Sequence, residues 1–134
     1  MKASQKIRIQ TNAAPPALGS YSQAIRVGDL VFVTGQTGRN PNTRKLLDGV
    51  EAQARQAMEN VAAVLNAAGC SPAGIVRANL VLTDIRDFAL VDEVYVRWLP
   101  DDRIVCHPAR TVFQAKALPA GALVMLDVIA TFPS

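Results

Sequence analysis

The sequence contains little of the material from which metal sites, disulfide scaffolds and membrane segments are built. It has 1 histidine and 2 cysteines, and none of them belongs to a cluster with metal-ligand spacing, so no metal site is expected. The cysteines, Cys70 and Cys106, are interpreted as reduced thiols because the N-terminus has no apolar secretory segment. No apolar run approaches the ~20 residues that a membrane span needs. These absences predict a cytoplasmic protein without a membrane partner.

Aromatic residues are also scarce, at 5% of the chain, and the 14 Lys and Arg residues are scattered. Nucleic-acid binding proteins usually concentrate basic charge and interleave aromatic residues with it. The net charge of +3 therefore indicates a solvated surface, and a nucleic-acid partner is not expected. What the chain does have is 50% hydrophobic residues within 134, enough for the core of a single domain over residues 1–134.

Hydrophobic periodicity predicts secondary structure in the order β-β-β-α-β-α-β-β. The first helix is expected to begin after Asp48, with Glu51 completing a capping box, and to end before Gly69. The second is expected from about Ile85 until Pro100 stops it. A polar segment over 35–47 is expected to form a loop. The strands are predicted at 6–10, 21–26, 30–34 and 75–82, with two more within 107–132.

This order predicts an α+β fold in which one mixed sheet carries two helices on one face. The other face has no helix to cover it. If that face carries Met125, Ile129 and Val112, it must meet another copy of the sheet. A symmetric oligomer is therefore expected, with sites at its subunit boundaries.

The last two predicted strands each carry one charge, Arg110 in the first and Asp127 in the second. A guanidinium in an apolar strand needs an anionic or carbonyl partner, because burying it alone is prohibitive. One interpretation is a structural ion pair between Arg110 and Asp127, or an arginine in an interface. The other is a fork that holds a ligand carboxylate by two hydrogen bonds. The strands alone do not choose between them.

At this point the sequence resembles the Rid family, also called YjgF or reactive-intermediate deaminases. The resemblance extends over roughly residues 6–132, and the landmarks together are far more specific than any one of them. They are Gly19-Ser-Tyr21-Ser-Gln23, Thr34-Gly35-Gln36, Asn40-Pro41-Asn-Thr43, Gln53-Ala54 with Asn60, Ala68-Gly69, and Pro108-Ala109-Arg110 followed by Leu118-Pro119.

The resemblance implies a homotrimer of the chorismate-mutase-like fold, with a central barrel and three clefts between subunits. Members hydrolyse small enamines and imines, such as those released from serine and threonine by dehydratases, to 2-keto acids and ammonia, and no cofactor is expected. In that scheme Arg110 binds the substrate carboxylate and Tyr21 closes the pocket. Thr34 and Gly35 provide polar or backbone contacts, and the backbone N–H of Val112 faces the ligand.

The sequence departs from the family at the residue that positions the attacking water. Active deaminases carry a glutamate there, and this chain has Met125, whose thioether cannot accept a proton from water. Asp127 lies on the same predicted face, ~7 Å along the strand. It is either a replacement that acts on water or a structural ion-pair partner. Asp92, where some members have asparagine, is a second departure.

Three functions are therefore compared. The first is an imine or enamine deaminase that is weak or altered in substrate range, with Arg110 as anchor and Asp127 as the candidate for water. The second is a non-deaminating relative that keeps the cleft and binds a keto acid or a similar carboxylate. The third is an endoribonuclease or translation inhibitor, which the scattered basic residues disfavour.

Overall fold

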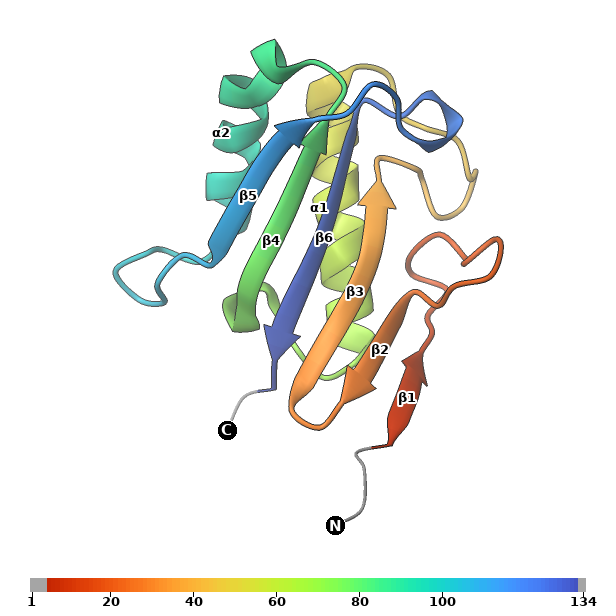
Figure 1. Cartoon of the computed structure of the whole chain (residues 1–134), viewed down its shortest axis with the longest axis vertical. Helices are drawn as coiled ribbons and strands as arrows, with labels where there is room; N and C mark the ends of the chain where they lie inside the picture. Colours follow the sequence, from red (N-terminus) through yellow and green to blue (C-terminus); the bar gives the residue numbers. More distant parts are fainter. Residues whose placement is uncertain (1–4, 133–134) are drawn as a thin grey trace.

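The computed structural model describes residues 5–132 and contains one six-stranded mixed sheet with two α-helices on one face (Figure 1). The predicted α+β class and the predicted element order are confirmed. The strands are β1 (Lys6–Ile9), β2 (Ala24–Val27), β3 (Leu30–Thr37), β4 (Ile75–Leu82), β5 (Ala109–Gln114) and β6 (Val124–Thr131). The helices are α1 (Val50–Ala67) and α2 (Phe88–Trp98), with short 3-10 turns η1 (Pro72–Gly74), η2 (Ile85–Asp87) and η3 (Pro119–Gly121).

The strand order across the sheet is β1-β2-β3-β6-β4-β5. Strands β4 and β5 run parallel, and the other neighbouring pairs run antiparallel. Strands β5 and β6 follow one another in the sequence but lie on opposite sides of β4, so they do not pair with each other. This arrangement leaves β1 and β5 as the two edges of the sheet.

The core lies between the sheet and the two helices. Aliphatic side chains on the inward face of the sheet pack against an apolar stripe of α1, as the helical spacing predicts. The largest fully buried side chains include Met58, Leu65, Leu80, Leu82 and Leu126. Neither helix within residues 5–132 is long and apolar enough to cross a membrane.

The two ends of α1 differ in how well the sequence predicts them. The N-cap is Gly49, at φ 85°, and no side chain caps the helix, so the prediction of Asp48 as the cap was wrong. The C-terminal prediction is confirmed, because Gly69 lies in the left-handed region at φ 83°. Its N–H donates to Asn66 O and the Cys70 N–H donates to Leu65 O, as in a Schellman motif.

Strand β4 contains an irregularity that the sequence pattern does not reveal. The pairing register with β6 shifts between Ile75 and Arg77, so that Ile75 is buried and Val76 points outward. Val76 therefore does not share a face with Ala78, which is buried. A bulge inserts one extra residue and reverses the alternation of side chains beyond it.

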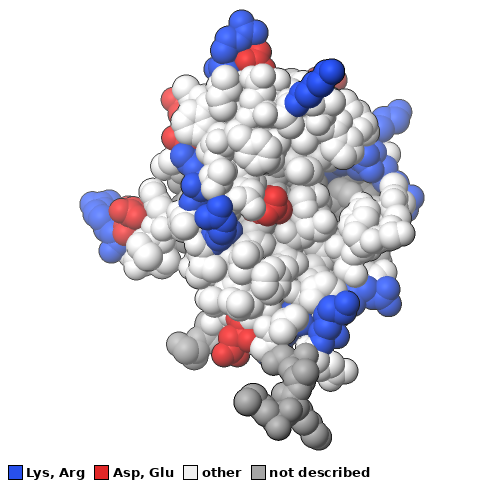
Figure 2. All heavy atoms as spheres, viewed as in Figure 1, with Lys and Arg blue, Asp and Glu red and all other residues white. Residues whose placement is uncertain are grey.

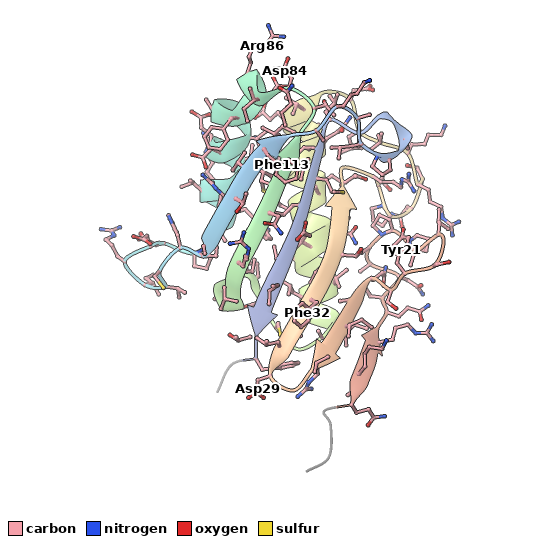
Figure 3. The ribbon with its side chains drawn as sticks, in the orientation of Figure 1. Tyr21, Asp29, Phe32, Asp84, Arg86 and Phe113 are labelled. Atoms are coloured by element: carbon pink, nitrogen blue, oxygen red, sulfur yellow. The ribbon has the colours of Figure 1, made fainter. Side chains whose placement is uncertain are left out.

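The face of the sheet opposite the helices is open in the single chain. Met125 and Ile129 lie on it, half-buried, as expected. Val112 does not, because it pairs with buried Leu80 and packs against the core on the helix face. Phe113 takes the outward position instead, and Phe32 lies on the same face over β3 (Figure 3). Figure 2 shows this face as mostly uncharged, with one acidic group near its centre, basic groups to the left of it and other Lys and Arg toward the rim.

Candidate functional site

A bulge in β3 shapes the candidate site. The strand was predicted to end at Thr34, but it continues to Thr37, and its register with β6 shifts between Val33 and Gln36. The pairs Val33–Val128 and Gln36–Leu126 leave two residues of β3, Thr34 and Gly35, opposite the single residue Asp127. Such a bulge bends a strand and redirects its side chains. It therefore brings the Thr34–Gly35 backbone next to Asp127.

This bulge forms part of the wall of a cavity of about 550 Å³. Four of the predicted site residues line the cavity together with Met125: they are Tyr21, Thr34, Gly35 and Asp127. The volume lies in the range of small-molecule sites. The structure thus brings together residues from three segments of the chain that are far apart in the sequence.

Tyr21 lies at the mouth of the cavity, on the segment that joins β1 to β2 (Figure 3). The residue is 52% exposed, and its hydroxyl oxygen accepts a hydrogen bond from the Leu18 N–H at 3.2 Å. The hydroxyl proton of Tyr21 therefore remains available to a ligand.

Buried Gln23 holds the segment that carries Tyr21 in place. Its side-chain amide donates to the carbonyls of Thr11 and Pro15 at 3.0 and 2.8 Å and accepts from the Thr11 N–H at 2.7 Å. These bonds use both the N–H groups and the oxygen of the side-chain amide. Although Gln23 also lines the cavity, we therefore infer that its side chain supports the loop.

Asp127 and Met125 point to the open face from adjacent outward positions of β6. Asp127 Oδ1 accepts a hydrogen bond from Asn79 Nδ2 at 2.9 Å, across the β4–β6 pair. Met125 packs over Gly35, and a Cβ atom at that glycine would lie only 2.7 Å from the Met125 sulfur. The thioether thus occupies the floor of the cavity, and the nearest carboxylate on this strand is that of Asp127.

Arg110 lies elsewhere, on edge strand β5 and on the helix face of the sheet. It pairs with Ala78 in the register, whereas Asp127 pairs with Asn79, so the two charged residues point to opposite faces. Within the chain, the predicted alternative of an Arg110–Asp127 ion pair was therefore wrong. The partner of Arg110 is Asp92 on α2, and the Arg110 Nη1 to Asp92 Oδ1 distance is 2.6 Å.

Aromatic rings of α2 support this guanidinium. The Arg110 Cζ lies 5.2 Å from the ring centroid of Phe88 and 4.9 Å from that of Tyr95, within the range of cation–π attraction. Burial raises the pKa of Tyr95, an effect that the charge of Arg110 partly offsets, so this phenol stays neutral at physiological pH. Arg110 keeps further N–H donors that Asp92 does not use.

Val112 presents its backbone rather than its side chain to the outside. The Ala115 N–H donates to Leu82 O on β4, and backbone groups alternate in direction along a strand. The N–H of Val112 therefore points away from β4, off the free edge of the sheet. Arg110 and Val112 lie on this edge strand, outside the cavity wall.

Sequence reasoning missed two parts of the site. Arg39 lines the cavity, and its sequence signal was only that it is one of three positive charges in a loop of turn residues. Asn60 was recognised as a landmark without a role: its side-chain amide donates to the carbonyls of Thr37 and Arg39 at 3.1 and 2.9 Å. It thereby fixes the chain just after β3.

Within residues 5–132, no three His, Cys, Asp or Glu side chains come together in a way that suits a metal ion. The two cysteines are free thiols, with Cys70 buried and Cys106 exposed. The chemistry available in the cavity is therefore that of hydroxyl, amide, carboxylate and guanidinium groups.

Comparison with known proteins identifies the family. The family described as Endoribonuclease L-PSP matches residues 11–132. A rat 2-iminobutanoate/2-iminopropanoate deaminase is 38% identical over 123 residues, which cover 91% of this chain and 87% of the rat protein.

Solved structures agree with this match. RidA from the Antarctic bacterium Psychrobacter sp. PAMC 21119 superposes with a TM-score of 0.89 at 43% identity, covering 94% of this chain and 99% of RidA. E. coli TdcF with bound serine gives a TM-score of 0.89 at 35% identity, covering 95% of this chain and 99% of TdcF. With its sheet, its helices and its Tyr21 to Arg110 landmarks in the family order, the chain belongs to the Rid/YjgF family.

Proposed function

We propose that the protein is a Rid-type deaminase that hydrolyses small 2-imino acids to 2-keto acids and ammonia. The observation that carries the proposal is the cavity that gathers Tyr21, Thr34 and Gly35 around the carboxylate of Asp127. Relatives at 37–39% identity that are named 2-iminobutanoate/2-iminopropanoate deaminases support the same reaction. TdcF with bound serine shows that a relative holds a small carboxylate-bearing molecule.

We infer that the complete site forms between copies of the chain in a homotrimer. The cavity lacks Arg110, and Arg110 lies on the free edge strand β5, where another copy can approach. The open face also exposes apolar side chains that a neighbouring sheet would cover, with Phe32 at 43% and Phe113 at 49% exposure. A neighbour's edge strand would then supply the guanidinium to the cavity of the first copy.

In this arrangement Arg110 holds the substrate carboxylate, and the Val112 N–H and the Thr34–Gly35 segment orient the imine. Tyr21 covers the ligand from the mouth of the cavity. Asp127 accepts a hydrogen bond from the attacking water and directs its lone pair toward the imine carbon. Water adds across the C=N bond, with its oxygen going to carbon and one proton to nitrogen. The resulting hydroxyl group then gives its proton to the nitrogen, the C–N bond breaks, and ammonia leaves the keto acid behind.

A second candidate function follows from Met125. Its side chain occupies the cavity floor against Gly35, at the position of the family's glutamate, and supplies no proton acceptor. If Asp127 does not replace that glutamate, the protein binds a keto acid or a similar carboxylate without deaminating imines.

The test is ammonia release from freshly generated 2-iminobutanoate and 2-iminopropanoate, measured above the spontaneous rate for wild type, Arg110→Ala and the exposed control Arg97→Ala. The deaminase proposal predicts activity in wild type and Arg97→Ala and its loss in Arg110→Ala. Activity retained in Arg110→Ala would overturn the site assignment. Inert wild type whose melting temperature rises with 2-oxobutanoate would favour the binding function.

The subunit arrangement has its own measurement. Light scattering after size-exclusion chromatography is expected to give three times the chain mass of 14.3 kDa. A monomer that releases ammonia would refute the shared site. RNA cleavage that falls steeply with salt would instead favour the endoribonuclease function.

A further inference from the structure

Arg39 is a cavity residue to which the proposed reaction gives no task. It follows β3 in the polar loop, and its backbone is fixed on both sides. The Asn60 amide donates to its carbonyl at 2.9 Å, and the residue forms a β-bridge with Leu46. The start of the Arg39 side chain is therefore held in place on the cavity wall.

The guanidinium of Arg39 has no anionic partner within residues 5–132. Its Nε is buried and forms no hydrogen bond. Arg55, Arg86, Arg103 and Arg110 each pair with a carboxylate, whereas none of these ion pairs includes Arg39. A partly buried guanidinium without an anionic partner is costly, so an anion that entered the cavity would stabilise this position.

Asp127, the carboxylate that lines the same cavity, is not the partner of Arg39. The Asp127 carboxylate accepts a hydrogen bond from Asn79, and it forms no ion pair with Arg39. The cavity therefore offers an uncompensated cation at one place and a hydrogen-bonded carboxylate at another. Tyr21 and Thr34 add hydroxyl groups to the same wall.

We propose that Arg39 binds a second carboxylate of the substrate, so that the site takes 2-imino dicarboxylic acids of four or five carbons. The inference rests on the proposed function, in which Arg110 of a neighbouring copy holds the carboxylate next to the imine carbon. Arg39 then holds the carboxylate at the far end of the chain. The cavity of about 550 Å³ has room for such a molecule, and planar guanidinium–carboxylate pairing suits both ends.

The hydrolysis itself is unchanged by the second carboxylate. Water adds to the imine carbon, the C–N bond breaks, and a 2-keto dicarboxylic acid and ammonia leave. Arg39 acts only on binding, because it contacts a group remote from the reacting carbon. Its loss is expected to raise KM for dicarboxylic imines and to leave monocarboxylic imines nearly unaffected.

The experiment compares 2-iminoglutarate with 2-iminobutanoate, each generated in situ by an amino-acid oxidase, for the full-length protein. The variants are Arg39→Leu, Arg39→Lys and the matched control Lys45→Leu, which removes an exposed positive charge from the same loop. In Arg39→Leu, kcat/KM for 2-iminoglutarate should fall about tenfold or more, with the value for 2-iminobutanoate changed by less than about threefold. Arg39→Lys should lower kcat/KM for 2-iminoglutarate less than Arg39→Leu does. Lys45→Leu should leave kcat/KM unchanged for both substrates.

Equal effects of Arg39→Leu on both substrates, or an effect on neither, would overturn the inference. Circular-dichroism melting of each variant separates a binding defect from a folding defect, and Arg39→Lys retains the test if Arg39→Leu does not fold. Binding of 2-oxoglutarate and 2-oxobutanoate by calorimetry separates the two proposals. If wild type releases no ammonia yet binds 2-oxoglutarate more tightly in an Arg39-dependent way, the deaminase proposal fails and this inference stands.

Discussion

The carboxylate of Asp92 and the guanidinium of Arg110 are joined at 2.6 Å, between the first half of α2 and the edge strand β5. Both side chains remain partly exposed, at 34% and 25%. The arginine proposed to hold the substrate carboxylate thus already has a carboxylate beside it. Under the proposed function, a ligand carboxylate shares the guanidinium with Asp92 or displaces it, so we expect Asp92 to lower the affinity of Arg110 for anions.

Replacing Asp92 by Asn should therefore strengthen the binding of 2-oxobutanoate. Asparagine keeps the shape and one acceptor oxygen, so it continues to orient Arg110 while it removes the competing charge. We expect the Kd to fall by about three- to tenfold, measured by calorimetry at low salt. Asp102→Asn, an exposed change outside α2, serves as the control. Weaker binding in Asp92→Asn would mean that the carboxylate is needed to position Arg110.

The residue at position 125 should set the rate of deamination. Met125→Glu places a carboxylate on the cavity floor beside Gly35, where it can accept a hydrogen bond from water. Ammonia release from 2-iminobutanoate is expected to rise by about tenfold or more. Met125→Gln has nearly the same size and no charge, and should stay close to wild type. Equal rates in the two variants would show that charge at this position is not what the reaction lacks.

Two glycines near the cavity should respond very differently to alanine. A Cβ at Gly38 would overlap the Cα of Gln53, which is backbone of α1 and cannot move away. A Cβ at Gly35 would meet the end of the flexible Met125 side chain. Gly38→Ala should cost about 2–4 kcal/mol of unfolding free energy and Gly35→Ala about 1 kcal/mol, as measured by urea denaturation.

The Gly35 result has an internal check. Adding Met125→Ala to Gly35→Ala removes the atoms that the new methyl group meets, so the two changes should couple favourably in a double-mutant cycle. Strictly additive effects would show that Gly35 is required for its backbone conformation rather than for its contact with Met125.

The stability of the fold should decrease at alkaline pH because of Cys70. Burial raises the pKa of its thiol, and the charge of Arg26 only partly offsets that effect. The folded state therefore keeps its proton at pH values where the unfolded chain loses it. Stability is fully present below the unfolded thiol pKa of about 8.5 and falls as the pH rises above it.

The measurement is the free energy of unfolding at pH 7 and pH 10 under reducing conditions. Between pH 7 and pH 10, the free energy of unfolding should fall less for Cys70→Ala than for wild type. Cys106→Ala, at an exposed position, should behave like wild type. The same pH dependence in wild type and Cys70→Ala would assign the effect to other groups, such as Tyr95, whose pKa burial also raises.

Periodicity, together with turn and cap residues, was sufficient to predict the two α-helices, the six strands and their order, because most of these elements bury one face. It could not predict register. Val112 was expected on the open face, but pairing with Leu80 turns it inward, and that pairing depends on tertiary contacts. The Arg110–Asp127 pair failed for the same reason, since one step of register separates the two faces of a sheet.

The roles of the predicted site residues stay predictions, but the fold brings four of them together. Tyr21, Thr34, Gly35 and Asp127 do line one cavity. Arg39 was not identified, because a charge in a loop carries no sign of where its side chain will point. The lengthening of β3 to Thr37 was missed because its last residues are small and polar, and only pairing with β6 makes them a strand.

The bulge at Thr34–Gly35 makes the site sensitive to chain length more than to residue type. In an uninterrupted strand, residues three apart point to opposite faces, yet Val33 and Gln36 are both buried on the helix side. The extra residue shifts by one position the alternation of inward and outward side chains in the rest of β3. A one-residue deletion here would restore regular alternation, so Gln36 would stay on the helix side, but the bulge that brings the Thr34–Gly35 backbone next to Asp127 would be lost. Conservative substitutions in this segment thus keep the shape of the cavity wall, whereas deletion of one residue removes it.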